Sequence, residues 1–463
     1  MSKSQLLHMR RLLSISVMPL LVALLLSAST AAQEFAPQAD PEDFGLVLPS
    51  GALEAGGGRR VLAKTMQGDV VVSQVHVAGE DRLIVILPNG RLLSLPNREA
   101  TATERPFEPA TKEAMTEELT SEKFKGFKTR ETKRYLYVYN ASEQFYQGTS
   151  HILETMYPAL FAYCKRQKLD VADPQVPLVV IMFRTQEEFD KYQQMPEGVV
   201  AYYNGVTNHV VMYEQSRLAV VAPDLAVKQS ISTIAHEGVH QILHNIGVQK
   251  RLSRWPMWIS EGLPEYFAPT TVDKRIRWKG VGLVNDLRMH TLQEFLKEQP
   301  VAPGEGDLIE QTVEAEQLDS LGYASAWALT SYLAKFKKDA FFAYLRDVSQ
   351  ARPLEEPEES NSELFAKHFG SDYAKLQAGL LKHLEKMPYT DPIANQTHYV
   401  ATISTGARRT VMITTSPASI QRWQSEFSAN LLPGERANAR LNVQAYPSRG
   451  AAQQAAESSL RGR

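Results

Sequence analysis

The amino-acid sequence predicts an α+β fold, in which a small N-terminal β-module is followed by a larger domain of strands and then helices. The first observation is that residues 60–96 consist of short β-type apolar runs, with a hairpin signal at 88–91. The second is that residues 131–389 begin with strand patterns and continue with helical periodicity to about Met387. Strands followed by a run of helices are typical of α+β domains.

The first half of the larger domain gives clear strand and helix patterns. In order, these predict a strand at 134–139, a helix at 145–168, a buried strand at 178–183 and a hairpin of 199–203 and 209–213. Thr185 is predicted to cap a short helix, because Glu188 stands at the capping-box position. The hairpin turns at Asn204-Gly205 or at Thr207-Asn208, which are both turn signals.

The segments on either side of this domain differ from it in composition. The predicted organisation is a signal peptide at 1–32, a flexible leader at 33–59, the β-module at 60–96, a polar linker at 97–130, the main domain at 131–389, a small αβ extension at 390–431 and a disordered tail at 432–463. Within the extension, strands are expected at 399–403 and 410–414 and a helix at 416–427. The β-module weakly resembles the SH3-like modules that precede catalytic domains in some exported bacterial proteins.

The N-terminus carries the features of an export signal. Lys3, Arg10 and Arg11 form a positive region, an apolar run follows, and small residues lead to a cleavage point near Ala32. The apolar run is about 15 residues long, shorter than the roughly 20 that cross a bilayer, which favours cleavage over an uncleaved membrane anchor. A twin-arginine signal is the other reading of Arg10-Arg11. We therefore expect an exported protein, periplasmic or extracellular, with no membrane association after cleavage.

Composition and charge restrict the kinds of partner. The chain has 463 residues, of which 43% are apolar and 22% charged, with a formal net charge of −2. This balance gives no indication of a nucleic-acid partner or of an anionic membrane. The single cysteine, Cys164, excludes an internal disulfide, and its apolar neighbours at helical spacing predict a buried, inert thiol.

The main functional signal is the segment 233–243, Thr-Ile-Ala-His-Glu-Gly-Val-His-Gln-Ile-Leu. Its apolar spacing predicts a helix that ends at Gly247. His236 and His240 then lie on one face, about 6 Å apart along the axis, where two imidazoles can bind one zinc ion. Glu237 is the next residue around the helix after His236, so its carboxylate is predicted to lie beside a metal-bound water. The alternative is a chance pair of histidines on a surface helix.

A second element, at 255–267, decides between these readings. Trp258, Glu261, Gly262 and Tyr266 form a Trp-x-x-Glu-Gly-x-x-x-Tyr pattern. With the first motif, this pattern resembles the glutamate-zincin (gluzincin) clan of metallopeptidases, and is closest to exported bacterial peptidase-like proteins of unassigned function. The resemblance covers roughly residues 130 to 390 and implies a zincin-like domain, with a mixed sheet and a helical lobe. It also implies that Glu261 is the third ligand of one zinc ion per chain.

The resemblance also implies roles for two further residues. Glu265, four residues after Glu261, would hold the outer nitrogen of His236, although a solvated acid is the other reading. Pro264 departs from the clan's pattern and is expected to kink the helix, at a cost of about 3 kcal/mol. Tyr323 leads a predicted helix, like the Tyr-led helix of aminopeptidase-type gluzincins, and would stabilise the transition state. Its alternative role is that of a core aromatic residue.

These residues predict zinc-dependent hydrolysis of peptide bonds by a metal-activated water, with Glu237 as general base. The substrate would be a peptide or protein, and the strand at 210–213 is predicted to be the edge that pairs with it. Endopeptidase action is favoured, because no Gly-x-Met-Glu-Asn sequence is present. The alternatives are a zinc-binding but catalytically idle protein of the cell envelope, and a structural protein that merely displays two histidines.

Overall fold

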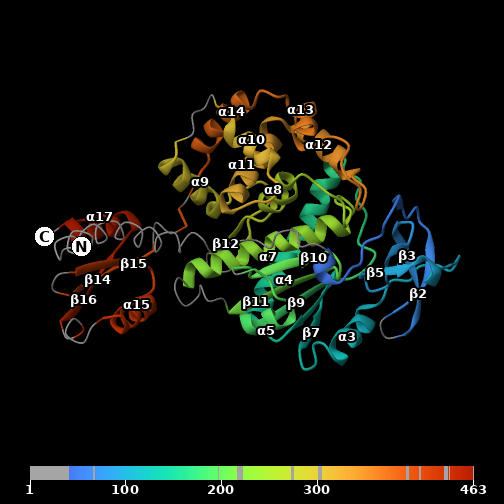
Figure 1. Ribbon diagram of the computed structural model, residues 1–463, viewed down its shortest axis with the longest axis horizontal. Helices are drawn as coiled ribbons and strands as arrows, with labels where there is room; N and C mark the ends of the chain where they lie inside the picture. Colours follow the sequence, from blue (N-terminus) through green and yellow to red (C-terminus); the bar gives the residue numbers. More distant parts are fainter. Residues whose placement is uncertain are drawn as a thin grey trace, which may run out of the picture. The chain divides into compact units, whose positions relative to one another are not determined.

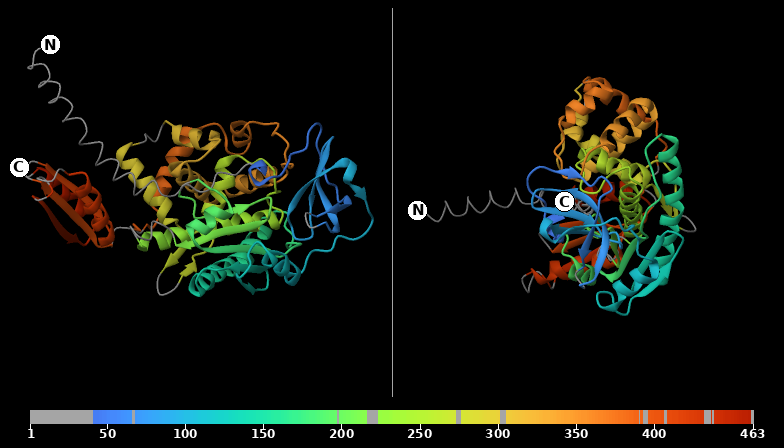
Figure 2. Two further views of the ribbon diagram at one scale, coloured as in Figure 1. Left: turned by 60° about the horizontal axis from the view of Figure 1, so that its bottom comes forward. Right: turned by 90° about the vertical axis from the view of Figure 1, so that its right-hand side faces the viewer.

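The structure is a computed structural model that describes residues 41–65, 68–196, 198–215, 223–272, 276–300, 305–389, 391–392, 396–405, 408–431, 436 and 438–461 (Figure 1). The predicted signal peptide and the beginning of the predicted leader lie outside the described residues. The described residues divide into two compact units, one within 41–215 and 228–389, the other with 223–227 and those within 391–461 (Figure 2). No helix in the described part of the chain is long and apolar enough to cross a membrane. The predicted mixed α and β fold, β-rich at its N-terminal end, is confirmed.

The N-terminal β-module is an antiparallel sheet. Its strands are β1 (Glu54–Ala55), β2 (Arg60–Lys64), β3 (Val70–Ala78), β4 (Arg82–Ile86), β5 (Leu92–Pro96) and β6 (Thr101–Ala102), in the order β5-β4-β3-β2-β6, with β1 also paired to β3. The hairpin predicted at 88–91 joins β4 to β5, and the amide of Gly90 donates to the carbonyl of Leu87. Gly90 has a φ of 82°, a backbone angle that glycine adopts without strain.

The segment predicted as a polar linker is partly folded. It contains α3 (Lys112–Ser121), capped by Thr111, and part of β7 (Lys128–Glu131). Met115 and Phe124 are buried and pack in one cluster with Phe183. The polar composition therefore reflects the exposed face of this segment, while a few apolar side chains are enough to attach it to the sheet.

The central sheet of the larger domain has five strands and mixed direction. They are β7, β8 (Tyr135–Tyr139), β9 (Leu178–Thr185), β10 (Ala201–Asn204) and β11 (His209–Gln215), in the order β10-β11-β9-β8-β7. Strands β8, β9 and β11 are parallel neighbours, and β7 and β10 are antiparallel. The prediction that residues 210–213 form the edge strand is wrong, because β11 lies between β9 and β10. The edge strand at this side is β10.

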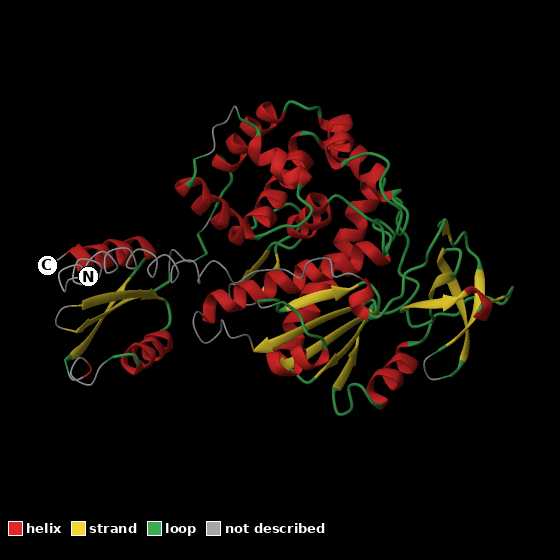
Figure 3. Cartoon of the chain, viewed as in Figure 1, coloured by secondary structure: helices red, strands yellow, loops and turns green. Residues whose placement is uncertain are grey.

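Helices cover both faces of this sheet. On one face lie α4 (Glu143–Arg166) and α7 (Pro223–Asn245); on the other lie α3 and α5 (Gln186–Tyr192) (Figure 3). The predicted capping box of Thr185 and Glu188 is present at the start of α5. Cys164 on α4 is buried, as predicted, and burial raises the pKa of its thiol to about 12. The side chains of β8 alternate between the two faces, so each face has its own apolar core.

A helical lobe follows the sheet in sequence. It contains α8 (Met257–Phe267), the short hairpin of β12 (Thr270–Val272) and β13 (Ile276–Trp278), and then α9 (Asp286–Glu298), α10 (Asp307–Glu314), α11 (Ser320–Phe336), α12 (Lys338–Ser349), α13 (Asn361–Phe369) and α14 (Tyr373–Glu385). The central helix, α11, packs against α8, α9, α10, α12 and α14. Helix α7 lies between this lobe and the sheet (Figure 1).

Helices α8 and α11 approach each other closely at Gly262. A Cβ atom there would lie 2.8 Å from the backbone oxygen of Ala326 and 2.4 Å from Oγ1 of Thr330. A backbone oxygen cannot move aside as the end of a side chain can. The contact is therefore possible only with glycine at this position.

Replacing Gly262 with alanine is expected to destabilise the fold by about 1–3 kcal/mol, because the added methyl group forces α8 and α11 apart. Thermal denaturation measures this as a lower Tm. Gly450→Ala is the matched control, since Gly450 is also helical and its Cβ would meet nothing within 4 Å. Equal Tm values for the two variants would contradict the close packing of α8 on α11.

The C-terminal unit is a three-stranded antiparallel sheet with a helix on each face. Its elements are β14 (His398–Thr405), β15 (Arg408–Thr414), α15 (Pro417–Ala429), β16 (Ala439–Tyr446) and α17 (Arg449–Arg461), with the sheet order β15-β14-β16. The prediction of a disordered tail at 432–463 is wrong, because β16 and α17 lie there. The composition of this segment does not indicate its folded state, because its core needs no large apolar side chains. Small residues such as Ala452 and Ala456 pack against Val400 instead.

Candidate metal centre

Helix α7 carries the first motif and is fixed by burial. Its apolar residues, including Ile234, Val239 and Ile242, are buried in the core that the helix shares with the sheet and the lobe. The helix ends before Gly247, whose φ of 89° supplies the predicted stop. Gly238 leaves room for α4, because a Cβ atom there would lie 2.3 Å from Cδ2 of Leu153. Burial of its apolar side chains and the close contact with α4 therefore fix the position of α7 in the core.

Three buried side chains converge where α7 meets α8. Nε2 of His236 lies 3.1 Å from Nε2 of His240 and 3.1 Å from Oε2 of Glu261. Nε2 of His240 lies 3.4 Å from the same carboxylate oxygen. The structure thus brings together all three ligands that the sequence and the resemblance predicted, and this group could hold a metal ion.

The geometry of this group fits a tetrahedral metal site. Zinc binds histidine nitrogen and carboxylate oxygen at about 2.0–2.2 Å, so two ligands of a tetrahedron are about 3.3–3.6 Å apart. The three separations, from 3.1 to 3.4 Å, are close to this value. Two nitrogens and one oxygen are also the donor set of many catalytic zinc sites.

The electrostatics of the site favour a cation. Burial alone would lower the pKa of His236, but hydrogen bonds to Glu261 and Glu265 outweigh it and raise the pKa to about 10. Burial alone would raise the pKa of Glu261, but His240 and His236 outweigh it and hold the pKa below its usual range. The negative potential that favours a proton on His236 also favours a metal ion among the three groups.

Glu265 lies behind His236, where the resemblance placed it. Its Oε1 is 3.1 Å from Nδ1 of His236 and 2.7 Å from Nη2 of Arg288, and its Oε2 accepts from Nδ2 of Asn285 at 2.7 Å. Burial raises its pKa, but Arg288 and His236 outweigh that effect and lower the pKa to about 2. Helix α8 continues through Pro264 to Phe267, so Glu265 keeps its place on the helix.

Sequence reasoning missed Arg288 and Asn285. Both are buried at the start of α9, where the side chain of Asn285 also accepts from the amide of Arg288 and caps the helix. The cap of Asn285 is explained within its own helix, and neither residue indicates a partner elsewhere in the chain, so the local sequence gives no sign of this contact with Glu265. Only the packing of α9 against α11 and α8 reveals it.

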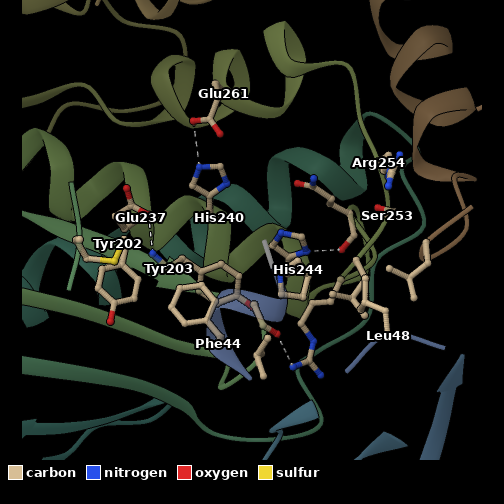
Figure 4. A pocket seen from close by; sticks show the side chains of 18 residues that line it. Phe44, Leu48, Tyr202, Tyr203, Glu237, His240, His244, Ser253, Arg254 and Glu261 are labelled. Atoms are coloured by element: carbon tan, nitrogen blue, oxygen red, sulfur yellow. Dashed lines mark hydrogen bonds and ion pairs between the residues drawn. The ribbon is translucent and has the colours of Figure 1, made fainter. Parts of the chain in front are cut away.

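Glu237 is held beside the metal group by the edge strand. The amide of Tyr203 on β10 donates to Oε2 of Glu237 at 2.8 Å (Figure 4). Burial raises the pKa of this carboxyl group. Glu237, His240 and Glu261 together line one side of a cavity of about 320 Å³. This cavity gives a ligand access to Glu237 and to two of the three groups that could hold a metal ion.

Tyr323 lies next to the metal group, in the first turn of α11. Its ring contacts the ring of His236 edge to face at 6.1 Å, and the guanidinium of Arg288 lies 5.1 Å from it. Burial, with Glu261 next in effect, raises the pKa of its hydroxyl well above the usual value. Tyr323 does not line the cavity that Glu237 lines. The structure thus places Tyr323 beside the candidate metal ligand His236. A catalytic role for its hydroxyl is a proposal, taken up below.

Three further histidines, His209, His244 and His290, are not among the groups that could hold a metal ion. His244 is one turn beyond His240, lines the same cavity and stacks on Tyr203 with ring centroids 5.3 Å apart. Burial lowers the pKa values of His244 and His209 to about 3. His290 contacts the hydroxyl of Tyr389. His244 therefore forms part of the wall of the cavity.

Comparison with known proteins gives one similarity. Residues 230–355 match the model of a family described as a protein of unknown function (DUF1570). A comparison with curated proteins found no match. The matched segment contains the three metal-binding groups, Glu237, Glu265 and Tyr323, so the similarity coincides with the candidate metal centre.

Proposed function

We propose that this protein is an exported zinc metallopeptidase of the glutamate-zincin type, which hydrolyses internal peptide bonds. The observation that carries the proposal is the convergence of His236, His240 and Glu261 at the spacing of a tetrahedral site. Glu237 adds a buried carboxylate beside that group and in the same cavity. A protein that only bound a metal would have no need of this carboxylate.

The residues of the chain divide the chemistry between them. A zinc ion bound by the three groups supplies a Lewis acid that lowers the pKa of a water molecule to about 7. Glu237 accepts the proton of the attacking water and then returns it to the leaving amine. Its raised pKa suits both steps, because a base with a pKa nearer to neutral can also act as an acid. The amide of Tyr203 fixes the orientation of its carboxylate.

The edge strand offers a way to bind an extended peptide. In the described part of the chain β10 ends its sheet, so its outer edge can pair with substrate backbone. Tyr202 and Tyr203 of β10 line the cavity beside Glu237. A peptide that added to this strand would bring one of its amide bonds to the metal group.

The experiment that tests the proposal combines elemental analysis with a digest of an unbiased peptide library. We expect one zinc ion per chain and cleavage of internal bonds that a chelator abolishes and added zinc restores. His240→Ala should lose the metal, whereas His244→Ala, one turn further along α7, should keep it. Failure to bind zinc would overturn the metal centre. Stoichiometric zinc without any cleavage would favour a catalytically idle cell-envelope protein instead.

Replacing Tyr323 with phenylalanine separates its two possible roles. If the hydroxyl stabilises the oxyanion, kcat should fall about 10²–10³-fold with unchanged zinc content. Phenylalanine keeps the ring contacts with His236 and Arg288, so a packing role alone would leave kcat unchanged. Steady-state kinetics on protein of known zinc content distinguish the two.

A further inference from the structure

Arg251 is a buried cation in the cavity that Glu237 and His240 line. It follows α7 and is only 8% exposed. Its Nη1 donates to the carbonyl oxygens of Gly90 at 2.7 Å and Gly205 at 3.3 Å. Among the described residues no carboxylate pairs with it, and no hydrogen bond to its Nε or Nη2 is present. A buried charge without an opposite charge is unfavourable, and an anionic ligand would remove that cost.

The groups around Arg251 do not neutralise it. The backbone oxygen of Arg251 contacts Nε2 of His76 at 2.8 Å, and burial together with the Arg251 charge lowers the pKa values of His76 and His244. Both histidines are therefore neutral at neutral pH. Arg254, which also lines the cavity, is largely exposed and pairs with Glu356. Arg251 thus lines this cavity as a buried cation, and no carboxylate in the described part of the chain pairs with it.

The β10–β11 hairpin connects Arg251 to the catalytic base. The amide of Tyr203 binds Glu237, and the carbonyl of Gly205, two residues later, accepts from Arg251. From the amide nitrogen of Tyr203 to the carbonyl oxygen of Gly205 the chain runs through three residues, which span at most about 10 Å. An extended peptide with its scissile bond at Glu237 would therefore bring a group within about three residues of that bond to Arg251.

We propose that Arg251 binds a carboxylate of the substrate within about three residues of the scissile bond, so that the cavity selects acidic peptides. The proposal rests on the proposed peptidase function. A guanidinium with Nε and Nη2 available presents the planar pair of donors that a carboxylate accepts. Phe44 and Leu48 (Figure 4) line the same cavity, as does Leu252, and apolar side chains around a guanidinium lower the local dielectric, which strengthens such a pair. The carboxylate can belong to an Asp or Glu side chain or to the C-terminus of the peptide.

The test measures binding rather than turnover. Zinc-loaded Glu237→Gln protein is titrated with a peptide that the wild type cleaves, and with versions in which each nearby carboxylate is replaced by its amide. We expect one such replacement to weaken binding about 10–100-fold, and its position identifies a side chain or the C-terminus as the source. In the same protein carrying Arg251→Gln, acid and amide versions should bind within about two-fold of each other.

Controls distinguish an anion site from a structural role. Arg254→Gln should leave the acid-to-amide ratio unchanged. Arg251→Lys, which keeps the charge but loses the planar donor pair, should give an intermediate ratio. Each ratio is measured within one variant, so it does not depend on the fraction of folded protein. If Arg251→Gln does not fold, the comparison of Arg251→Lys with intact Arg251, both in the Glu237→Gln protein, decides the matter. Equal binding of acid and amide peptides by protein with Arg251 intact would overturn the inference. Absence of all cleavage by the wild type would instead overturn the peptidase proposal.

Discussion

Glu237→Gln is expected to keep one zinc ion per chain and to lower kcat by about 10²–10⁴-fold, the usual contribution of a general base. Glutamine has the same shape, and its amide oxygen can still accept the hydrogen bond from the amide of Tyr203. It cannot take a proton from water. Because the three metal-binding groups are unchanged, KM should change little and kcat/KM should fall with kcat.

Elemental analysis and steady-state kinetics on the same preparation test this expectation. Glu117→Gln is a suitable control, since Glu117 lies exposed on α3 and the substitution removes one carboxylate far along the chain from the motif. A Glu237→Gln protein with near wild-type turnover would show that another group is the base. One that lost its zinc would show that Glu237 contributes to metal binding.

Glu265→Gln is expected to lower the free energy of unfolding by about 3–5 kcal/mol, because it leaves the guanidinium of Arg288 buried without an opposite charge. Arg288 and Glu265 are both almost completely buried and 2.7 Å apart. The substitution also weakens the partner of Nδ1 on His236, so zinc affinity should fall about 10–100-fold. Chemical denaturation measures the first effect, and competition with a chelator measures the second.

A double variant separates these two effects. In Glu265→Leu/Arg288→Met no buried charge is left unpaired, so the protein should recover much of the stability that the single variant loses. Its zinc affinity should stay low, because His236 still lacks its carboxylate partner. If the single variant unfolds at the same denaturant concentration as the wild type, the buried ion pair of Glu265 and Arg288 does not stabilise the fold.

Two of the three candidate metal ligands could be predicted from the sequence because their arrangement is local. His236 and His240 are four residues apart on one helix, and helical geometry alone places them on the same face. Glu261 needed a second motif and a family resemblance, since spacing does not determine how two helices pack. Arg288 and Arg251 could not be predicted, because their contacts depend on segments that meet only in the folded protein.

The errors in the predicted fold have similar causes. Strands β10 and β11 have comparable apolar patterns, so the sequence does not say which one pairs with β9 and which forms the edge. The average polarity of the segments at 97–130 and 432–463 predicts a linker and a disordered tail. In both, a few buried side chains, such as Met115 and Ala452, are enough to order a helix.

Arg251 joins the hairpin turn at Gly90 to the turn at Gly205 through a single nitrogen. The wall of the cavity is therefore assembled from two parts of the chain that lie far apart in sequence. If an acidic ligand on Arg251 strengthens its attachment to the turn at Gly90, thermodynamic reciprocity requires that this attachment strengthens binding of the ligand by the same factor. Under that condition, an acidic ligand should protect the N-terminal strands from proteolysis. Cleavage of those strands should in turn lower the affinity for the ligand.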